Sequence, residues 1–304
     1  MVTLQQLIYF RELAHTGNQT RTAEQLYITQ TTLSNTIRNL ERQLGIRLFE
    51  RSGRSLRLSE PGQKYLHYID EALQALDNAQ TVINDYKDSS EQSVSVAMTS
   101  AGVWSNVVYG FRSAYDSYNI RQINCGRDQF RPMLLEQQID YAIVGTDDIS
   151  LTGLEYTVIC EETLFLCVSR EHPLADREGI YLTQLRDEPF INLPESSGFR
   201  VFCDRLFERA GIPCHAVLEC DYTLRGKLVA GGYGVAVTTN SSRRQNLLGT
   251  GITYIPILDD FARRPVAVVW NPRRYLSKAA LDFRNYVLTR GNGTEQSDEE
   301  EMPG

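Results

Sequence analysis

Apolar residues between positions 20 and 44 recur at the spacing of an α-helix. Leu33, Ile37, Leu40 and Leu44 are separated by four, three and four positions, which places them on one side of a helix. Thr29 comes before this repeat, and its hydroxyl can accept a hydrogen bond from a free N–H group of the first turn. The segment predicts two short helices joined by a tight turn at positions 27 and 28.

Flanking patterns add a helix before this pair and a hairpin after it. The helix is marked by Leu4, Leu7, Ile8 and Leu13. Residues 45–51 and 55–58 alternate apolar and polar side chains around Gly53, which predicts two short strands that form a wing. Together these segments predict a winged helix-turn-helix.

The polar face of the second short helix carries no acid. Opposite the apolar stripe lie Thr31, Asn35, Arg38 and Arg42. Short polar side chains followed by arginines suit the major groove of DNA, where Asn can pair with adenine and Arg can reach guanine or phosphate. The solvated face of an ordinary amphipathic helix would show the same pattern, so this face alone does not decide between the two.

A longer helix is predicted from residue 59 to about residue 87. Ser59 can cap it, Glu60 suits its positive end, and Pro61 fits its first turn. Its apolar residues recur at spacings of three and four: Leu66, Ile69, Leu73, Leu76 and Ile83. This is a coiled-coil repeat of under three heptads, so the helix either pairs with that of a second chain or packs on its own domain. The polar stretch at residues 85–93 predicts a hinge.

Strand and helix patterns alternate from residue 93 to residue 288. Strands are predicted at residues 93–98, 121–125, 141–144, 164–169, 190–193, 216–219, 235–237 and 266–270, and helices at residues 103–118, 129–138, 198–210, 222–230 and 278–288. Such alternation predicts mostly parallel sheets with right-handed crossovers. The order of the strands indicates two similar lobes, joined by two crossings near residues 155–162 and 259–265.

Composition places the chain among globular proteins of two or three domains. Its 304 residues are 42% hydrophobic and 23% charged, and no apolar run approaches the ~20 residues of a membrane span. We expect a cytoplasmic protein without a membrane partner. Residues 1–58 contain eight Arg and four Glu, whereas the whole chain has a formal net charge of −7. Net acidity argues against charge-driven DNA binding, but a basic head is sufficient for a specific binder.

Motifs for catalysis or metal binding are absent from the sequence. There is no GxSxG elbow, no GxGxxG after a strand and no P-loop lysine. The six Cys form no CxxC pair and no Cys/His ligand spacing, and the four His are scattered. The sequence therefore predicts no enzyme activity, no metal and no cofactor.

The N-terminal segment resembles the winged helix-turn-helix of LysR-type transcriptional regulators. The matching residues are Leu4 to Phe10, Ala23 to Leu26, Thr29, Gln30, Leu33, Ser34, Ile37, Leu40, Glu41, Leu44, Gly45, Leu48 to Arg51 and Leu58. Members of the family usually differ at Gln19, Thr31 and Asn35. Two of these positions lie on the base-reading face, so the departures concern the operator sequence and leave the fold unaffected.

The resemblance extends to about residue 290 and implies the domain organisation. The fold class is α/β, with a winged helix-turn-helix DNA-binding domain (residues 1–58), a linker and dimerisation helix (59–88) and a two-lobed effector domain (91–290) like type 2 periplasmic binding proteins. Lobe I comprises about 91–160 and 266–290, and lobe II about 163–262. Residues 291–304 end in an acidic cluster and are predicted to be disordered.

Three groups of site residues follow. The DNA-binding group is Thr20, Arg21, Thr29, Gln30, Thr31, Thr32, Ser34, Asn35, Arg38, Arg51 and Arg54. The effector-binding group stands mainly where strands end and helices begin, as ligand sites in open sheets do, and consists of Thr99, Ser100, Asp128, Gly145, Thr146, Ser197, Phe199 and Thr238. The dimerisation group is Leu66, Ile69, Leu73, Leu76 and Ile83. The effector-binding residues could instead only cap helices and end strands.

The resemblance implies a transcription factor that responds to a small molecule. Its partners would be double-stranded DNA, a small-molecule effector and further copies of itself in a homodimer or homotetramer, with RNA polymerase as a further candidate. One alternative is a solute or metabolic sensor without sequence-specific DNA binding. Another is a thiol-switch regulator that uses Cys203 and Cys214. A peroxide-sensing branch of the family has its reactive cysteine near Ser197 and Gly198, where this chain has none, so we favour an effector.

Overall fold

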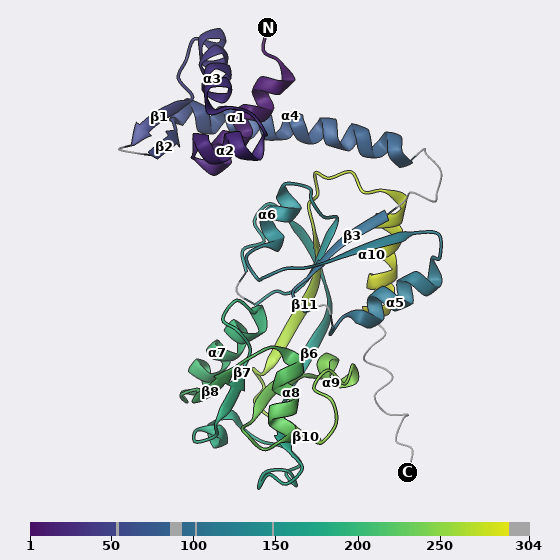
Figure 1. The fold of residues 1–304 in the computed structure, drawn as a ribbon. Helices are drawn as coiled ribbons and strands as arrows, with labels where there is room; N and C mark the ends of the chain where they lie inside the picture. The colour runs from purple at the N-terminus through teal and green to yellow at the C-terminus, as the bar shows by residue number, and fades with distance from the viewer. Residues whose placement is uncertain (53–54, 86–92, 101, 148, 292–304) are drawn as a thin grey trace. The chain divides into compact units, whose positions relative to one another are not determined.

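A computed structural model describes residues 1–52, 55–85, 93–100, 102–147 and 149–291 of the chain (Figure 1). Two compact units divide the chain, Met1–Ile83 and Asn84–Gly304. Most of the predicted hinge and nearly all of the predicted acidic tail lie outside the described residues. None of the described helices has the length and apolar composition that crossing a bilayer requires.

The N-terminal unit is a three-helix head with a wing and a long helix. Its elements are α1 (Leu4–Thr16), α2 (Gln19–Gln25), α3 (Gln30–Leu44), β1 (Phe49–Ser52), β2 (Ser55–Leu58) and α4 (Glu60–Asp85). Thr29 caps α3 as predicted, and Tyr27 in the preceding turn has a left-handed φ of 53°. The helical stripe of Leu33, Ile37 and Leu40 is buried against α1. The winged helix-turn-helix expected from the sequence is confirmed.

The first half of α4 is part of the core of this head. Ile69 and Leu73 are only 6% and 5% exposed and belong to the same cluster as Phe10 on α1, and Leu66 packs at its edge. The second half is different, since Leu76 is 52% and Ile83 57% exposed. The seam predicted for a second chain is therefore corrected for Ile69 and Leu73, because their own chain already covers them, whereas Leu66 is half-buried.

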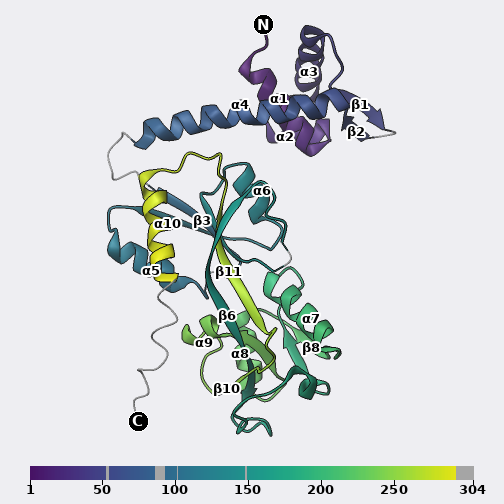
Figure 2. The same cartoon turned by 180° about the vertical axis from the view of Figure 1, so that it is seen from behind.

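Lobe I of the second unit is a sheet with helices on both faces. Its parallel strands are β3 (Ser93–Met98), β4 (Asn119–Asn124) and β5 (Tyr141–Gly145), and β11 (Arg263–Trp270) adds antiparallel to β5. One face is covered by α5 (Ser105–Ala114) and α10 (Lys278–Gly291), the other by α6 (Phe130–Leu135) (Figures 1 and 2). The aromatic rings of Phe111 and Phe283 join α5 to α10, with centroids 5.1 Å apart.

Lobe II is built around the second half of β6 (Glu155–Ser169). Its other elements are η2 (Leu182–Leu185), β7 (Phe190–Asn192), α7 (Gly198–Ala210), β8 (Ala216–Glu219), α8 (Tyr222–Ala230), β9 (Ala236–Thr239), α9 (Asn240–Arg244) and β10 (Ile252–Pro256). Alternate residues of β6 face opposite ways, so Leu166 packs in the cluster of α7 and Cys167 in that of α8. Helices therefore cover both faces of this lobe as well.

The strand directions differ from the prediction of mostly parallel sheets. Pairs β3–β4, β3–β5 and β7–β8 are parallel, but β6 runs antiparallel to β9, β10 and β11. The reason is the length of β6, which contains the first predicted crossing and continues into lobe II without a loop. Its first half pairs with β11 and its second half with β9 and β10, so both lobes share one seven-stranded sheet.

Candidate functional site

The polar face of α3 is exposed, as a DNA-reading surface requires. Thr31, Asn35 and Arg38 are exposed, and Ser34 is half-buried. Asn35 and Arg38 make no hydrogen bond or ion pair with any described residue, so both side chains can reach a ligand. Thr20 and Arg21 are also exposed, at the start of α2.

Some predicted DNA contacts also hold the head together. Thr29 Oγ1 accepts a hydrogen bond from the Thr32 N–H at 3.1 Å and lies 2.8 Å from Thr32 Oγ1. Gln30 Nε2 donates to Gln19 Oε1 at 3.4 Å, which links α3 to α2. These groups fix the start of α3, so their contribution to DNA binding would come partly through the position of the helix. Arg54 and the side chain of Arg51 lie outside the described residues.

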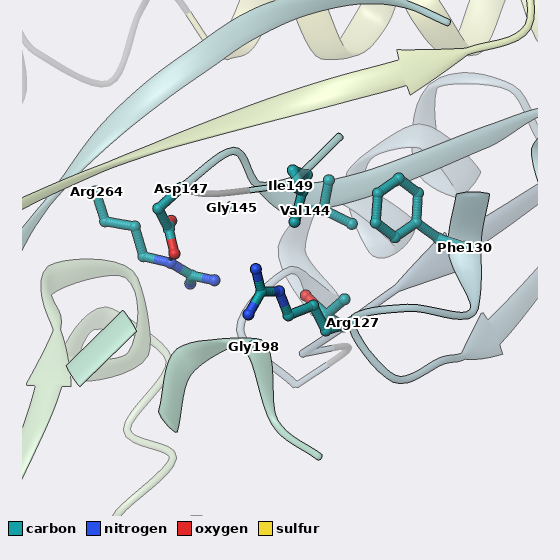
Figure 3. Close-up of a pocket in the computed structure, with 9 residues that line it drawn as sticks. Arg127, Phe130, Val144, Gly145, Asp147, Ile149, Gly198 and Arg264 are labelled. Carbon is teal, nitrogen blue, oxygen red and sulfur yellow. Dashed lines mark hydrogen bonds and ion pairs between the residues drawn. The ribbon is translucent and has the colours of Figure 1, made fainter. Parts of the chain in front are cut away.

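A pocket lies between the two lobes of the second unit, where the strands of lobe I end (Figure 3). It is lined by Thr99, Arg127, Phe130, Val144, Gly145, Asp147, Ile149, Gly198 and Arg264. Gly198 belongs to α7 of lobe II, whereas the strand ends and Arg127 belong to lobe I. The pocket contains about 240 Å³ of empty space, its open side included. Arg127 and Arg264 extend toward one another across it (Figure 3).

Arg264 is the best-anchored charge in this pocket. Its Nε donates to Asp147 Oδ1 at 3.1 Å, and its Nη1 lies 3.4 Å from Glu162 Oε2. Burial lowers the pKa of this guanidinium, but the carboxylates of Asp147 and Glu162 outweigh that effect and raise it, so the side chain stays charged. The ring of Phe199 lies under it at 5.4 Å. Glu162 also accepts a hydrogen bond from Thr239 Oγ1 at 3.0 Å.

Gly145 makes room for this arrangement at the end of β5. A methyl group added there would lie 2.3 Å from Arg264 Nη2 and 2.5 Å from its Cζ. Any side chain at this position would push the guanidinium out of its site. The absence of a Cβ therefore lets the strand end approach Arg264 closely.

The predicted effector-binding residues are only partly brought together. Thr99 and Gly145 line the pocket, and Phe199 supports Arg264 from below. Ser100 of lobe I lies near the hydroxyl group of Tyr222 of lobe II and acts to lower the pKa of that hydroxyl, although burial raises it overall. Thr146 Oγ1 donates to the carbonyl of Pro265 at 3.4 Å.

The remaining three have different surroundings. Ser197 precedes α7 without a side-chain capping bond, Thr238 is fully buried in β9, and Asp128 is exposed and does not line the pocket. Position at a strand end thus led to the surroundings of this pocket but not to each residue that lines it.

Sequence reasoning missed Arg264, Arg127 and Asp147 as pocket residues. Arg127 and Asp147 stand in strand-end segments that the sequence did indicate. Arg264 lies on a crossing strand, beside the apolar run that begins at Val266. The signal in the sequence was an arginine at the start of an otherwise apolar strand, since a charged residue there needs a buried partner or a ligand. Among the described residues, no group of His, Cys, Asp and Glu could hold a metal ion.

Two family models match the chain and together cover most of it. The family described as bacterial regulatory helix-turn-helix protein, lysR family, matches residues 4–63. The family described as LysR substrate binding domain matches residues 88–292. The two matches correspond to the winged head and to the two-lobed unit.

Characterised and uncharacterised regulators are similar over nearly the whole length. The HTH-type transcriptional regulator YybE of Bacillus subtilis, named as uncharacterised, is 29% identical over 301 residues, which cover 94% of this chain and 98% of that protein. The RuBisCO operon transcriptional regulator of Allochromatium vinosum is 27% identical over 291 residues, with 95% and 96% covered. Both names denote transcriptional regulators, in agreement with the prediction that the chain is not an enzyme.

Solved structures share the fold. A substituted full-length OxyR from Pseudomonas aeruginosa gives a TM-score of 0.65 at 21% identity and covers 95% of this chain and 98% of its own. Full-length CbnR in complex with its target DNA gives a TM-score of 0.57 at 22% identity, with 95% and 99% covered.

A winged helix-turn-helix followed by a two-lobed substrate-binding domain defines a class of transcriptional regulators that carry a DNA-binding head and a ligand-binding domain in one chain. This chain belongs to the LysR family of bacterial transcriptional regulators.

Proposed function

We propose that the effector of this regulator is a small molecule with an acidic group, bound in the pocket between the lobes. The observation that carries this proposal is the approach of Arg127 and Arg264 from two sides of that pocket (Figure 3). A guanidinium group can donate hydrogen bonds to an acidic group placed beside it, and here two of them approach the same space. Thr99 lines the same pocket.

The mechanism contains no chemical step. Effector binding favours one arrangement of the lobes over another, because the pocket has residues from both. In a dimer or tetramer this shift changes how paired heads span the operator. The protein acts in the cytoplasm, where DNA and RNA polymerase are present; polymerase is proposed as a partner from family membership and no residue is assigned to it.

A ligand screen on the full chain tests the effector proposal. An acidic effector should raise the melting temperature of the wild type by mass action and should have a smaller effect on Arg127→Gln. The matched control is Arg121→Gln, which removes an exposed arginine from the neighbouring β4. An effector that stabilises Arg127→Gln as strongly as the wild type would place the binding site elsewhere.

For DNA, we propose that Asn35 and Arg38 read base edges in the major groove. Asn35→Ala should reduce discrimination at one base pair of each half-site by about 1–3 kcal/mol, measured by competition binding with operator variants. Gln43→Ala, in the last turn of α3, is the control and should leave discrimination unchanged. Equal behaviour of the two variants would favour a sensor without sequence-specific DNA binding.

A further inference from the structure

A second pocket lies inside lobe II and contains a buried arginine, two of whose nitrogens have no hydrogen-bond partner among the described residues. The pocket is lined by Asn192, Leu193, Phe199, Arg200, Cys203, Phe207, Arg225 and Val237, and it holds about 230 Å³ of empty space, its open side included. Arg225 projects from α8 and is only 3% exposed. Its Nε and Nη2 are buried and have no hydrogen-bond partner among the described residues.

The two unpartnered nitrogens form one edge of the guanidinium. The N–H bonds of Nε and Nη2 point in parallel, at the spacing of the two oxygens of a carboxylate. Opposite this edge no described carboxylate is available. Arg200 binds Asp204 at 2.7 Å and Glu219 at 3.3 Å, while Glu162 pairs with Arg264. The pocket therefore presents a bidentate donor with no acceptor.

The thiols and the phenol that lie near Arg225 are neutral at physiological pH, and the carboxylate of Asp221 at the start of α8 accepts hydrogen bonds from the N–H groups of Thr223 and Leu224. Burial raises the pKa of Cys203 and of Cys167 to about 12, although the charge of Arg225 acts to lower both. Burial likewise raises the pKa of Tyr222, whose ring lies 5.0 Å from the guanidinium carbon. The ring offers a cation–π contact but no negative charge. A buried cation without a counterion is unfavourable, so this site is incomplete as it stands.

We propose that the Arg225 pocket is an anion-binding site, separate from the pocket between the lobes, for a small oxyanion that offers two oxygens side by side. A carboxylate and an inorganic oxyanion share this chemistry. The pocket is small, so it suits a small ion or the acidic head group of a larger molecule. Phe199 lines this pocket and its ring also lies under Arg264. An anion bound here would therefore lie against the ring that supports Arg264 in the first pocket.

Thermal unfolding of the full chain tests the proposal with formate, sulfate and chloride at equal ionic strength. Salts also change stability through exclusion from the protein surface, so the informative quantity is the difference between wild type and variant. In the wild type, formate or sulfate should give a saturating rise of about 3 °C over chloride. The more effective of the two identifies the source, carboxylate or inorganic.

Three variants separate the site from general salt effects. Arg225→Met should lose the saturating rise and be no less stable than the wild type in chloride, since it removes an uncompensated buried charge. Arg225→Lys keeps the charge but not the two-pronged edge, and should need at least about tenfold more anion. Lys227→Met removes an exposed charge from the same helix and should behave as the wild type.

Two results would overturn the proposal: no saturating rise in the wild type, or an equal rise in Arg225→Met. Arg127→Gln should retain the rise, because Arg127 belongs to the other pocket. If Arg225→Met does not fold, the wild type supplies the answer through the ¹⁵N signal of Arg225 Nε, assigned by its loss in Arg225→Lys. Formate or sulfate should shift this signal, and an unchanged signal would refute binding.

Discussion

Glu41 shows how one buried acid can hold the DNA-binding head together. It is 7% exposed, and its Oε1 accepts hydrogen bonds from the N–H groups of Leu48 at 2.9 Å and Phe49 at 3.2 Å, where the wing begins. Its Oε2 also binds Arg47 at 3.2 Å. From the sequence, Glu41 is only one of four acids in a basic segment. In the structure it links α3 to β1.

Replacing Glu41 by Ala should destabilise the head. Two buried N–H groups would lose a charged acceptor, which costs about 1–3 kcal/mol, measured as the free energy of unfolding in urea. Glu50→Ala, at an exposed position of β1, should change stability by less than about 0.5 kcal/mol. Equal losses in both variants would mean that water replaces the Glu41 carboxylate.

Gly62 on α4 lies too close to the backbone of Leu48 to carry a side chain. A methyl group added to it would lie 2.0 Å from the carbonyl oxygen of Leu48. Since that oxygen belongs to the backbone, it cannot move aside as a side-chain end would. Gly62→Ala should therefore lower the melting temperature, whereas Ala72→Gly, at an exposed position of the same helix, should cost only about 1 kcal/mol of helix propensity. Thermal scans of both variants make the comparison.

At the scale of elements, α4 explains why the apolar repeat misled the prediction. A three-four repeat defines the face of a helix that is buried but does not say what buries it. In the first half of α4 the head of the same chain covers Ile69 and Leu73. In the second half Leu76 and Ile83 are left exposed. We propose this second half as the contact between protomers.

Charged substitutions distinguish the two halves. Leu76→Glu and Ile83→Glu should leave the head folded by circular dichroism but shift the oligomer toward monomers in light scattering, because a charge is then buried at the contact. Leu73→Glu should instead unfold the head, since it places the charge in the core. A folded Leu73→Glu monomer would return Leu73 to the interface, and an unchanged mass for the other two would remove α4 from it.

Elements with a local signal were predicted well, and elements without one were not. Capping and periodicity gave α3, α7, α8 and α10 to within a few residues. The helix predicted at residues 103–118 is only Ser105–Ala114, because turns occupy both of its ends. The short strand β10 was missed, and β6 was seen only as its second half. Strands depend on partners far away in the sequence, which one chain read alone does not reveal.

The same limit applied to the candidate site. Thr99 and Gly145 follow apolar strands, so their position near a pocket could be predicted from strand ends. Arg264 becomes a pocket residue only because β11 pairs with β6 in the register that sets Arg264 opposite Glu162. Long-range register of this kind leaves no mark in the spacing of residues along one segment.

For the whole molecule, buried thiols predict how stability depends on pH. Burial raises the pKa of Cys125 to about 11 and those of Cys160, Cys167 and Cys203 to about 12. In the unfolded chain these thiols ionise near pH 8.5. Between these values the unfolded state holds fewer protons than the folded state, so stability should fall as pH rises above about 8.5.

Two measurements check this expectation. Urea unfolding between pH 8 and pH 10.5 should show a progressive loss of stability. Alkylation at pH 8.5 should leave these four thiols unmodified until the protein unfolds, because the thiolate is the reactive form. A reversible loss of two thiols on peroxide treatment, together with an altered DNA footprint, would instead support the thiol-switch alternative.

The continuous pair β6 and β11 determines the mechanics of the two-lobed unit. A loop hinge bends at a few soft dihedral angles, but here the lobes are joined by a hydrogen-bonded ribbon whose peptide units must deform together. The ladder is irregular between Val266 and Ala267 of β11, which pair with Cys160 and Val158 of β6. The one extra residue on β6 is a β-bulge, which allows local bending and stronger twist. The paired strands should resist twisting everywhere except at this bulge. Rotations of one lobe relative to the other should therefore stay small. The lobes should return to their resting angle once the ligand has left.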